Sequence, residues 1–579
     1  MCARVSKQPV IDNTRPGRFE WLLLHGLFYT LLFLVLGPLT LAVALYLKHW
    51  RLSRIGKTFL ITAAILWLLL TPLILTSLWQ LWLYTIPTTP LVLLLLQGFN
   101  DIAQLLKPMT LQEYLAKEER TAKVEDRRLS EKASNLPMPA LEVGCLRLGA
   151  IIRGDSFARQ PDFAQRQGFL CMAEEVLDQH LFLLGTTGAG KSETIKRLVT
   201  EILAATDRHI YFVDGKGDEE LANDIRSLTH QFGRGSAPVF KLGFDRYGAI
   251  YDGFRGTGAD IYNRLCALIG IHEAEGDAQY YADGNRDLLQ LICYASSGPP
   301  HNFEAIRNRL QKDWLLAAYQ DNPVEREMIE ALTHKEIEGL ARRIRPLVRE
   351  FNPCIGDEGF ALEETPCAIF SLRVQSVGDT SKRFLDFLVE DLKDFIGKRQ
   401  QHPSVLIIDE FGQFSNKNIT ALLSLARSSQ LGVILATQDV ASLKDETTKK
   451  LVLANTRTKL LMATDFPEDV ATLAGTFYQI EASIQQQDGG MTGLGSARVQ
   501  HAFKVDMNEV AQLQPGEAFL IRQRHAAKIK IKPIGPVAHI APQAEEHRLD
   551  RSKNGQPKPK IPPQIPPTKR YVTPGEALL

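Results

Sequence analysis

Residues 181–192 read Leu181-Phe-Leu-Leu-Gly-Thr-Thr-Gly-Ala-Gly-Lys-Ser192. An apolar run of strand length enters the pattern Gly-x-x-x-x-Gly-Lys-Ser, which is the signature of a phosphate-binding loop. Glycine allows tight turns, so successive backbone N–H groups can point at a polyphosphate. Lys191 is expected to reach the β- and γ-phosphates, and the Ser192 hydroxyl is expected to ligate Mg²⁺. The stretch therefore predicts a site for ATP and Mg²⁺ between a strand and a helix.

A helix is expected to follow the loop, with its positive N-terminal end facing the anion. Its apolar residues recur at the spacing of one helix face: Ile195, Leu198, Val199, Ile202 and Leu203. The residues predicted to bind the nucleotide are Gly185, Thr186, Thr187, Gly188, Ala189, Gly190, Lys191, Ser192 and Glu193. The alternative is a decayed loop that serves only as a turn.

The chain has 579 residues, too many for one hydrophobic core, and its length suggests about three or four units. Its 67 basic and 66 acidic residues nearly cancel, so bulk charge indicates no particular partner. The seven cysteines are scattered and never form a Cys-x-x-Cys pair. This pattern argues against a disulfide framework or a zinc site and fits a reducing compartment.

Two apolar stretches precede the loop, at about 21–47 and 59–83, with a basic connector between them. Each is long enough to cross the roughly 30 Å hydrocarbon layer of a membrane. The first is too long for a cleavable signal peptide, and a second one follows it. We therefore predict a membrane anchor over residues 1–100.

The sequence allows either two or three membrane spans. Two spans place both chain ends in the cytoplasm but leave the basic connector outside, against the positive-inside tendency. Three shorter spans, the third at 78–96, put the connector inside and the N-terminus outside. Both solutions keep the nucleotide site in the cytoplasm, and we favour two spans.

The rest of the chain suggests an α/β nucleotide-binding domain with a helical insert. Residues 209–214 form an apolar run that completes a strand–helix–strand unit of a parallel sheet. The predicted parts, in order, are a stalk helix and linker (101–140), the first part of the α/β domain (141–269), an all-α domain (270–355), the second part of the α/β domain (356–540) and a disordered Pro- and Lys-rich tail (541–579). Residues 485–500 are expected to be a mobile loop.

The helical insert carries two basic clusters. They are Arg307, Arg309 and Lys312, then Arg342, Arg343, Arg345 and Arg349. Such clusters are either ordinary solvated helix faces, which we favour, or a surface that touches DNA.

A second set of polar residues follows apolar runs in the later half of the chain. The strand predicted at 404–409 ends in Asp409 and Glu410. Asp409 is expected to hold Mg²⁺ through water, and Glu410 to accept a proton from the attacking water. Asp214 competes for the Mg²⁺-holding role, because it too follows an apolar run, but the adjacent acidic pair and the Gln438 strand after it favour Asp409. The alternative for the acidic pair is a strand-end turn.

Two further residues are candidates for catalysis. Gln438 ends the next predicted strand and is expected to contact the γ-phosphate or the water, unless it is only a sheet-end amide. Arg427 lies between the Asp409 and Gln438 strands. If Arg427 reaches the ATP of a neighbouring subunit, it would stabilise the charge that develops on the phosphates during hydrolysis. The alternative is an ordinary surface arginine.

These features, in this order, resemble the type IV secretion coupling proteins, the membrane-anchored ATPases of bacterial conjugation. Besides the two spans and the helical insert, the motifs that carry the resemblance are Gly185-Thr-Thr-Gly-Ala-Gly-Lys-Ser192, Val213-Asp-Gly-Lys-Gly217, Ile407-Ile-Asp-Glu-Phe411, Leu425-Ala-Arg-Ser-Ser429, Ala436-Thr-Gln438, Asn455 and Leu513-Gln-Pro-Gly-Glu517. The resemblance covers roughly residues 20–530. The whole set is far more specific than the phosphate loop alone.

The resemblance implies a RecA-like P-loop NTPase domain with an inserted all-α domain, assembled as a homo-hexamer on the bacterial inner membrane. It implies ATP hydrolysis coupled to movement of single-stranded DNA and its relaxase into a type IV secretion channel. Two departures stand out: the loop between the spans is very short, and glycine follows Asp214 where a proline is expected. The alternatives are a double-stranded DNA translocase, a coupling ATPase for protein export, or a membrane scaffold gated by nucleotide.

Overall fold

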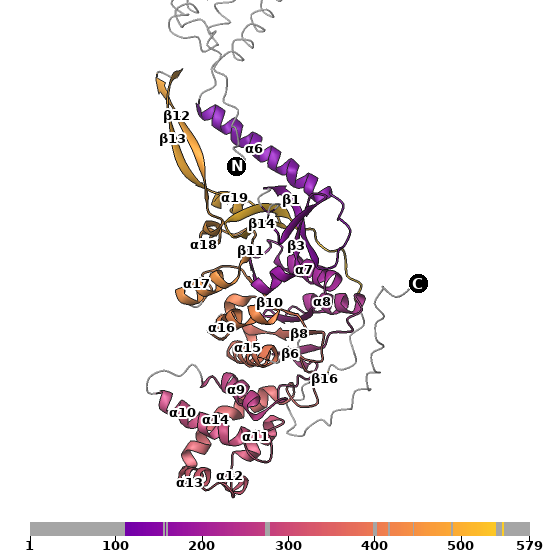
Figure 1. Ribbon diagram of the computed structural model, residues 1–579, viewed down its shortest axis with the longest axis vertical. Helices are drawn as coiled ribbons and strands as arrows, with labels where there is room; N and C mark the ends of the chain where they lie inside the picture. The colour runs from indigo at the N-terminus through magenta and orange to yellow at the C-terminus, as the bar shows by residue number, and fades with distance from the viewer. Residues whose placement is uncertain are drawn as a thin grey trace, which may run out of the picture. The chain divides into compact units, whose positions relative to one another are not determined.

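The computed structural model describes residues 111–154, 157, 160–271, 278–397, 402–414, 417–443, 445–487, 490–539 and 547–548 (Figure 1). The chain divides into two compact units, one of 1–117 with 484–494 and one of 118–483 with 495–579. The predicted anchor at 1–100 lies outside the described residues. Within the described part, no helix is both long and apolar enough to cross a membrane. The helix α6 (Leu111–Asn135) covers the predicted stalk.

The second unit is built on a 12-stranded mixed sheet. Its strands, in spatial order, are β2 (Phe163–Arg166), β3 (Phe169–Ala173), β1 (Cys145–Arg153), β15 (His525–Lys530), β14 (Glu517–Arg522), β11 (Thr458–Leu461), β4 (Leu181–Leu184), β10 (Leu431–Thr437), β9 (Ser404–Asp409), β5 (His209–Asp214), β8 (Cys367–Leu372) and β6 (Val239–Leu242). Neighbours from β11 to β6 pair in parallel, and those from β2 to β11 pair antiparallel. The fold is therefore α/β, as predicted.

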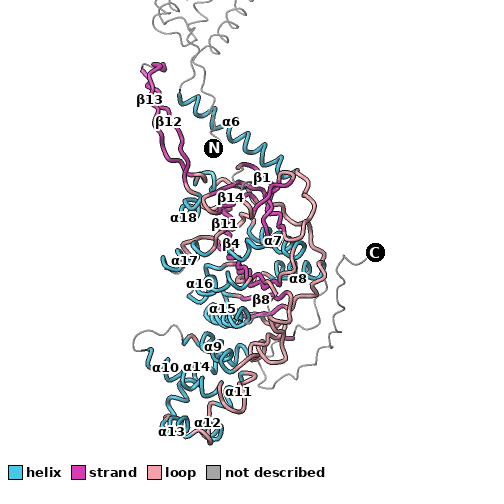
Figure 2. Tube along the Cα trace, viewed as in Figure 1, coloured by secondary structure: helices cyan, strands magenta, loops and turns pink. Residues whose placement is uncertain are grey.

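The parallel strands are buried on both faces, which explains their unbroken apolar sequences. On β4, Phe182 and Leu184 face one hydrophobic core, and Leu181 and Leu183 face the other. Helices α7 (Lys191–Ala205) and α8 (Glu219–Gln231) contribute to the second core (Figure 2). Helices α9 (Gly258–Ile269), α15 (Val374–Gly397) and α16 (Lys417–Ala426) contribute to the first.

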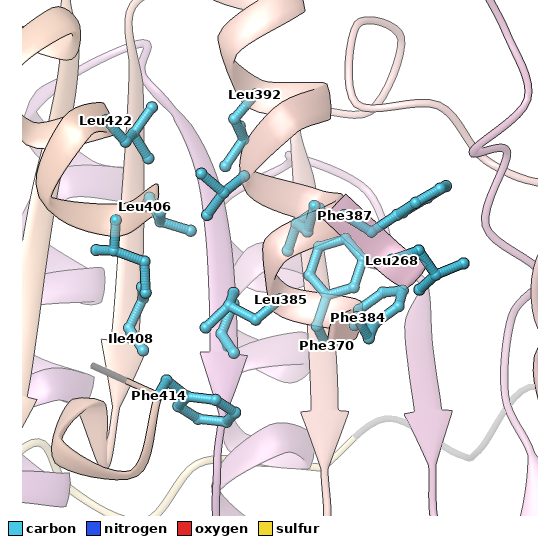
Figure 3. Packing of buried hydrophobic residues seen from close by; sticks show 14 of the residues in the cluster. Leu268, Phe370, Phe384, Leu385, Phe387, Leu392, Leu406, Ile408, Phe414 and Leu422 are labelled. Carbon is cyan, nitrogen blue, oxygen red and sulfur yellow. The ribbon is translucent and has the colours of Figure 1, made fainter. Parts of the chain in front are cut away.

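Aromatic packing fixes α15 against the sheet. Figure 3 shows Phe384 of α15 beside Phe370 of β8, and Leu385 of α15 and Leu406 of β9 belong to the same core. The ring of Phe384 also stacks on Phe240 of β6, with centroids 4.3 Å apart. Strand β9, which ends in Asp409, contributes Leu406 and Ile408 to this core.

The chain between β7 (Arg246–Tyr247) and β8 is mainly helical in its described part. The helices after α9 are α10 (Ala278–Cys293), α11 (Phe303–Arg309), α12 (Lys312–Ala318), α13 (Pro323–Ala331) and α14 (His334–Phe351). Their buried residues, such as Leu288 and Leu340, belong to the same core as one face of the sheet. The all-α character predicted for this segment agrees with the helices, while the boundaries 270–355 stay a prediction.

The mobile loop predicted at 485–500 is wrong. Strands β12 (Thr476–Gln487) and β13 (Gly490–Phe503) form a two-stranded sheet of their own. The glycines suggested a loop, but strand pairing uses backbone groups that glycine also carries. Within the predicted tail, the structure describes only β16 (His547–Arg548), which pairs with β7.

Candidate nucleotide site

The phosphate loop lies between β4 and α7, as the sequence predicts. Gly188 and Gly190 have φ angles of 84° and 100°, a backbone conformation that favours glycine. A Cβ atom on Gly185 would lie 2.8 Å from the Cβ atom of Met462. The loop glycines are therefore required by backbone geometry and by close packing.

Backbone hydrogen bonds fix this loop to three distant segments. The N–H of Gly185 donates to the carbonyl of Thr437 at 3.3 Å, and the N–H of Thr186 to that of Ala463 at 2.8 Å. The N–H of Gly516 donates to the carbonyl of Ala189 at 3.1 Å. The ends of β10 and β11 and the turn before β14 thus support the loop. In the sequence, Gly516 stands out only as part of the motif Leu513-Gln-Pro-Gly-Glu517, which does not reveal this supporting role.

Lys191 is buried within the loop. Its Nζ donates to the carbonyl oxygens of Gly185 at 2.6 Å and Thr186 at 3.3 Å. Burial lowers the pKa of Lys191, and the negative charge of Glu410 opposes that shift. Ser192 is partly exposed in the first turn of α7, and Glu193 pairs with Lys196 at 2.6 Å.

Asp409 and Asp214 end adjacent strands in register, but their carboxylates differ in their partners. Asp214 accepts hydrogen bonds from the backbone N–H groups of Lys216 and Asp218 and from the Ser371 hydroxyl. Asp409 is 1% exposed, and its Oδ1 accepts from the N–H of Glu410 at 2.9 Å. Its Oδ2 is buried and has no hydrogen-bond partner among the described residues.

This difference separates the two candidates for the metal. Asp214 is occupied in holding the turn that follows β5, whereas Asp409 keeps one oxygen free. Burial raises the pKa of both carboxyls, that of Asp214 to about 6. A buried carboxylate oxygen needs a partner, and a metal-bound water supplies one. The geometry therefore favours Asp409 over Asp214.

Glu410 and Gln438 are joined by a direct hydrogen bond. The Nε2 of Gln438 donates to Oε1 of Glu410 at 2.8 Å, and the Oγ1 of Thr187 donates to Oε1 of Gln438 at 3.1 Å. Glu410 has a φ of 56°, a left-handed conformation that is uncommon for a side chain of its size and is found at functional sites. The sheet order explains the contact, because β10 lies between β4 and β9.

These side chains fit a nucleotide with Mg²⁺. The N-terminal end of α7 and Lys191 are suited to phosphates. The Ser192 hydroxyl and the free oxygen of Asp409 are oxygen ligands of the kind that Mg²⁺ prefers. The structure thus gathers Lys191, Asp409, Glu410 and Gln438 at one end of β4, β9 and β10.

Arg427 lies elsewhere. It is exposed in a short 3₁₀ turn (Arg427–Ser429) immediately before β10 begins. Thr437, at the other end of β10, contacts the phosphate loop. The structure therefore places Arg427 at the opposite edge of the sheet from Lys191 of the same chain.

The two basic clusters of the helical segment have different environments. Arg309 is buried, donates to the carbonyls of Ile292, Gly298 and Pro299, and lies over the ring of Trp314. Arg309 is therefore structural, whereas Arg307 of the same cluster is exposed and pairs with Glu304 at 3.0 Å. The second cluster lies on α14, where its members are exposed: Arg342, Arg343, Arg345 and Arg349.

Comparison with known proteins supports the resemblance seen in the sequence. Residues 403–515 match a family model described as the TraM recognition site of TraD and TraG. None of the curated proteins compared matches the chain significantly.

Among solved structures, the unbound bacterial conjugative coupling protein TrwBdeltaN70 shares the fold, with a TM-score of 0.51 and 17% identity. That match covers 70% of this chain and 99% of the other. The plasmid coupling protein TrwB in complex with ADP and Mg²⁺ matches with a TM-score of 0.48 and 17% identity, covering 70% and 98%. The family model and the shared fold confirm the resemblance to the type IV coupling proteins.

Proposed function

We propose, with this resemblance as the premise, that the chain is a membrane-anchored ATPase that couples a relaxase–single-stranded DNA substrate to a type IV secretion channel and drives its transfer. One observation carries the proposal. Lys191, Asp409, Glu410 and Gln438 meet at one edge of the sheet, and three of them lie in the segment that matches the family model.

ATP would bind with its phosphates on the loop Gly185–Ser192 and the N-terminal end of α7. Lys191 would bind the β- and γ-phosphates, and Ser192 and Asp409 would hold Mg²⁺. The metal supplies positive charge that offsets the charge on the phosphates.

Hydrolysis would use Glu410 and Gln438 together. The attacking water transfers a proton to Glu410 while its oxygen bonds to the γ-phosphorus. The bond from that phosphorus to the ADP oxygen breaks, which releases ADP and phosphate. Gln438 lies 2.8 Å from Glu410 and also contacts the loop through Thr187, so it would orient the water and report on the γ-phosphate.

A ring of identical subunits, which we propose to be a homo-hexamer, explains the position of Arg427. In its own chain it lies at the sheet edge remote from Lys191, and it is exposed. A neighbouring subunit could present it to the γ-phosphate, where an arginine stabilises transition-state charge. We place the assembly on the inner membrane through residues 1–100.

The DNA contacts would be mainly electrostatic. A strand held through its phosphates needs basic side chains and shows strong salt dependence. The exposed arginines of α14 are candidates for contacting DNA or the relaxase complex, and the tail at 541–579 is another.

An ATPase assay on the full chain in lipid nanodiscs tests the proposal. We expect hydrolysis that single-stranded DNA stimulates and that Lys191→Ala abolishes. Lys449→Ala is a matched control, because Lys449 pairs with Glu446 and Asp469 on the protein surface.

The rival functions give other outcomes. Stimulation by duplex DNA alone would indicate a double-strand translocase. Hydrolysis that ignores nucleic acid would favour protein export. No hydrolysis at high protein concentration would indicate a nucleotide-gated scaffold.

A further inference from the structure

The turn after β5 presents one lysine to the catalytic residues. Asp214 accepts hydrogen bonds from the backbone N–H groups of Lys216 at 2.9 Å and Asp218 at 2.5 Å. A Cβ atom on Gly215 would lie 2.7 Å from a ring carbon of Phe414. A Cβ atom on Gly217, whose φ is 69°, would lie 2.5 Å from Cγ of Arg373. Close packing at Gly215 and Gly217 therefore fixes the backbone on both sides of Lys216.

From this turn, Lys216 reaches Glu410. Its Nζ lies 2.8 Å from Oε1 of Glu410, the same oxygen that accepts a hydrogen bond from Gln438. Both donors therefore end on one carboxylate oxygen. While they remain there, these two contacts fix the orientation of the Glu410 carboxylate.

The two ends of this ion pair differ in exposure. The side chain of Lys216 is 36% exposed, whereas that of Glu410 is 5% exposed. Glu410 is thus enclosed, and Lys216 can meet a solute at the surface of the turn. A second cation is close by, because Arg373 contacts Gly217 and lies over the ring of Phe244 at 4.1 Å.

An ammonium in this position can exchange one anion for another. Coulombic attraction to a phosphate is comparable to attraction to a carboxylate, and single-stranded DNA presents phosphates along its whole backbone. Arg373, which is partly exposed, adds a second positive charge near the turn. The chemistry therefore suits a polyanion that competes with Glu410 for Lys216.

We propose that Lys216 is a positioning residue that couples cargo binding to hydrolysis. It holds Glu410 through the ion pair, and a DNA phosphate that draws the ammonium away releases the carboxylate to turn toward the attacking water and accept its proton. This inference rests on the proposed function and adds the regulation of the same site.

The test compares Lys216→Ala, Lys216→Arg and the control Lys449→Ala as full chains in nanodiscs. ATP hydrolysis is measured as kcat and KM against the concentration of a poly(dT) oligonucleotide. We expect Lys216→Ala to raise the DNA-free kcat about fivefold, equivalent to about 1 kcal/mol for one ion pair, with the KM for ATP unchanged. DNA should no longer stimulate hydrolysis by Lys216→Ala. The Lys216→Arg variant should keep both the low DNA-free kcat and the stimulation by DNA.

Three other outcomes would contradict the proposed role of Lys216. A raised KM for ATP would place Lys216 on the nucleotide and overturn the inference. Loss of hydrolysis in Lys216→Ala with recovery in Lys216→Arg would show that Glu410 needs the cation, which also overturns it. An unchanged basal rate with full stimulation would show that the ion pair is only structural.

The same experiment distinguishes failure of the proposed function from failure of the coupling role of Lys216. If wild type ignores DNA while Lys216→Ala raises the basal rate, the DNA proposal fails and the restraint on Glu410 stands. If wild type responds to DNA and Lys216→Ala behaves identically, only the coupling role of Lys216 fails. If wild type does not hydrolyse ATP, both fail.

Discussion

Replacing Gly516 by alanine should loosen the phosphate loop without touching any residue that contacts nucleotide. Gly516 has a φ of 79°, and its N–H donates to the carbonyl of Ala189 at 3.1 Å. Its own carbonyl accepts from the N–H of Ile531 at 2.8 Å. A Cβ atom there would lie 3.1 Å from the carbonyl oxygen of Ile531.

The cost follows from these contacts. Holding alanine in the left-handed region costs about 1–2 kcal/mol. A shift that relieves the contact with Ile531 also weakens the bond to Ala189, worth about 0.5–1.5 kcal/mol. Together these lower the stability of the closed loop by about 2–3 kcal/mol, which is roughly 30- to 150-fold in its opening equilibrium.

Amide hydrogen exchange of residues 186–190, followed by mass spectrometry, measures this opening. We expect exchange to rise by that factor in Gly516→Ala, and nucleotide affinity to fall in parallel if binding requires the closed loop. Gly339→Ala is the control, because Gly339 is exposed in α14 with no atom within 4 Å of its Cβ position. A folded Gly516→Ala with wild-type exchange and affinity would refute the supporting role of Gly516.

Three further predictions concern the carboxylates and Arg427. Asp409→Asn should reduce Mg²⁺-dependent hydrolysis about 10- to 100-fold, with no loss in unfolding free energy, as measured by activity against Mg²⁺ concentration and by denaturant titration. The folded-state pKa of Asp214 is about 6 against an ordinary 3.8, so protonation favours the folded state. As pH falls from 7 to 4, the stability of wild type relative to Asp214→Asn should increase by about 2.4 kcal/mol in denaturant titrations; a constant difference would contradict the burial argument. Arg427→Ala should lower kcat about 10³-fold, and mixing it with Lys191→Ala should restore activity at shared sites; normal activity of Arg427→Ala alone would exclude the interface role.

The sequence was sufficient to predict that Lys191, Asp409 and Gln438 lie at one edge of the sheet. Apolar runs ending in Asp409 and Gln438 indicated buried parallel strands, and such strands end at a common edge. The adjacent acidic pair and the Gln438 strand already favoured Asp409 over Asp214, and the structure adds that Oδ2 of Asp409 is the carboxylate oxygen without a partner among the described residues. The role of Gly516 was also hidden, since the sequence does not show that it lies against Ala189.

The strands after residue 510 were not predicted for a related reason. Strands β14 and β15 contain the buried charges Arg522 and Lys528, which obscure an apolar pattern. Arg522 pairs with Asp162 at 3.0 Å, and Lys528 pairs with Glu517 at 3.5 Å. Buried charges are tolerated when paired, and the partners are known only once the chain has folded. Arg309, expected in a basic surface cluster, is buried because backbone carbonyls accept its hydrogen bonds, which the sequence likewise does not show.

The position of β4 has a consequence for synthesis of the chain. Both neighbours of β4 in the sheet, β10 and β11, come from residues 431–461. At translation rates of roughly 5–20 residues per second, β4 leaves the ribosome roughly 12–50 s before either partner exists. During that interval an apolar strand has two unpaired edges, which is the condition under which nascent chains aggregate. The strand that leads into the phosphate loop is therefore expected to depend on chaperones until the second half of the chain has been made.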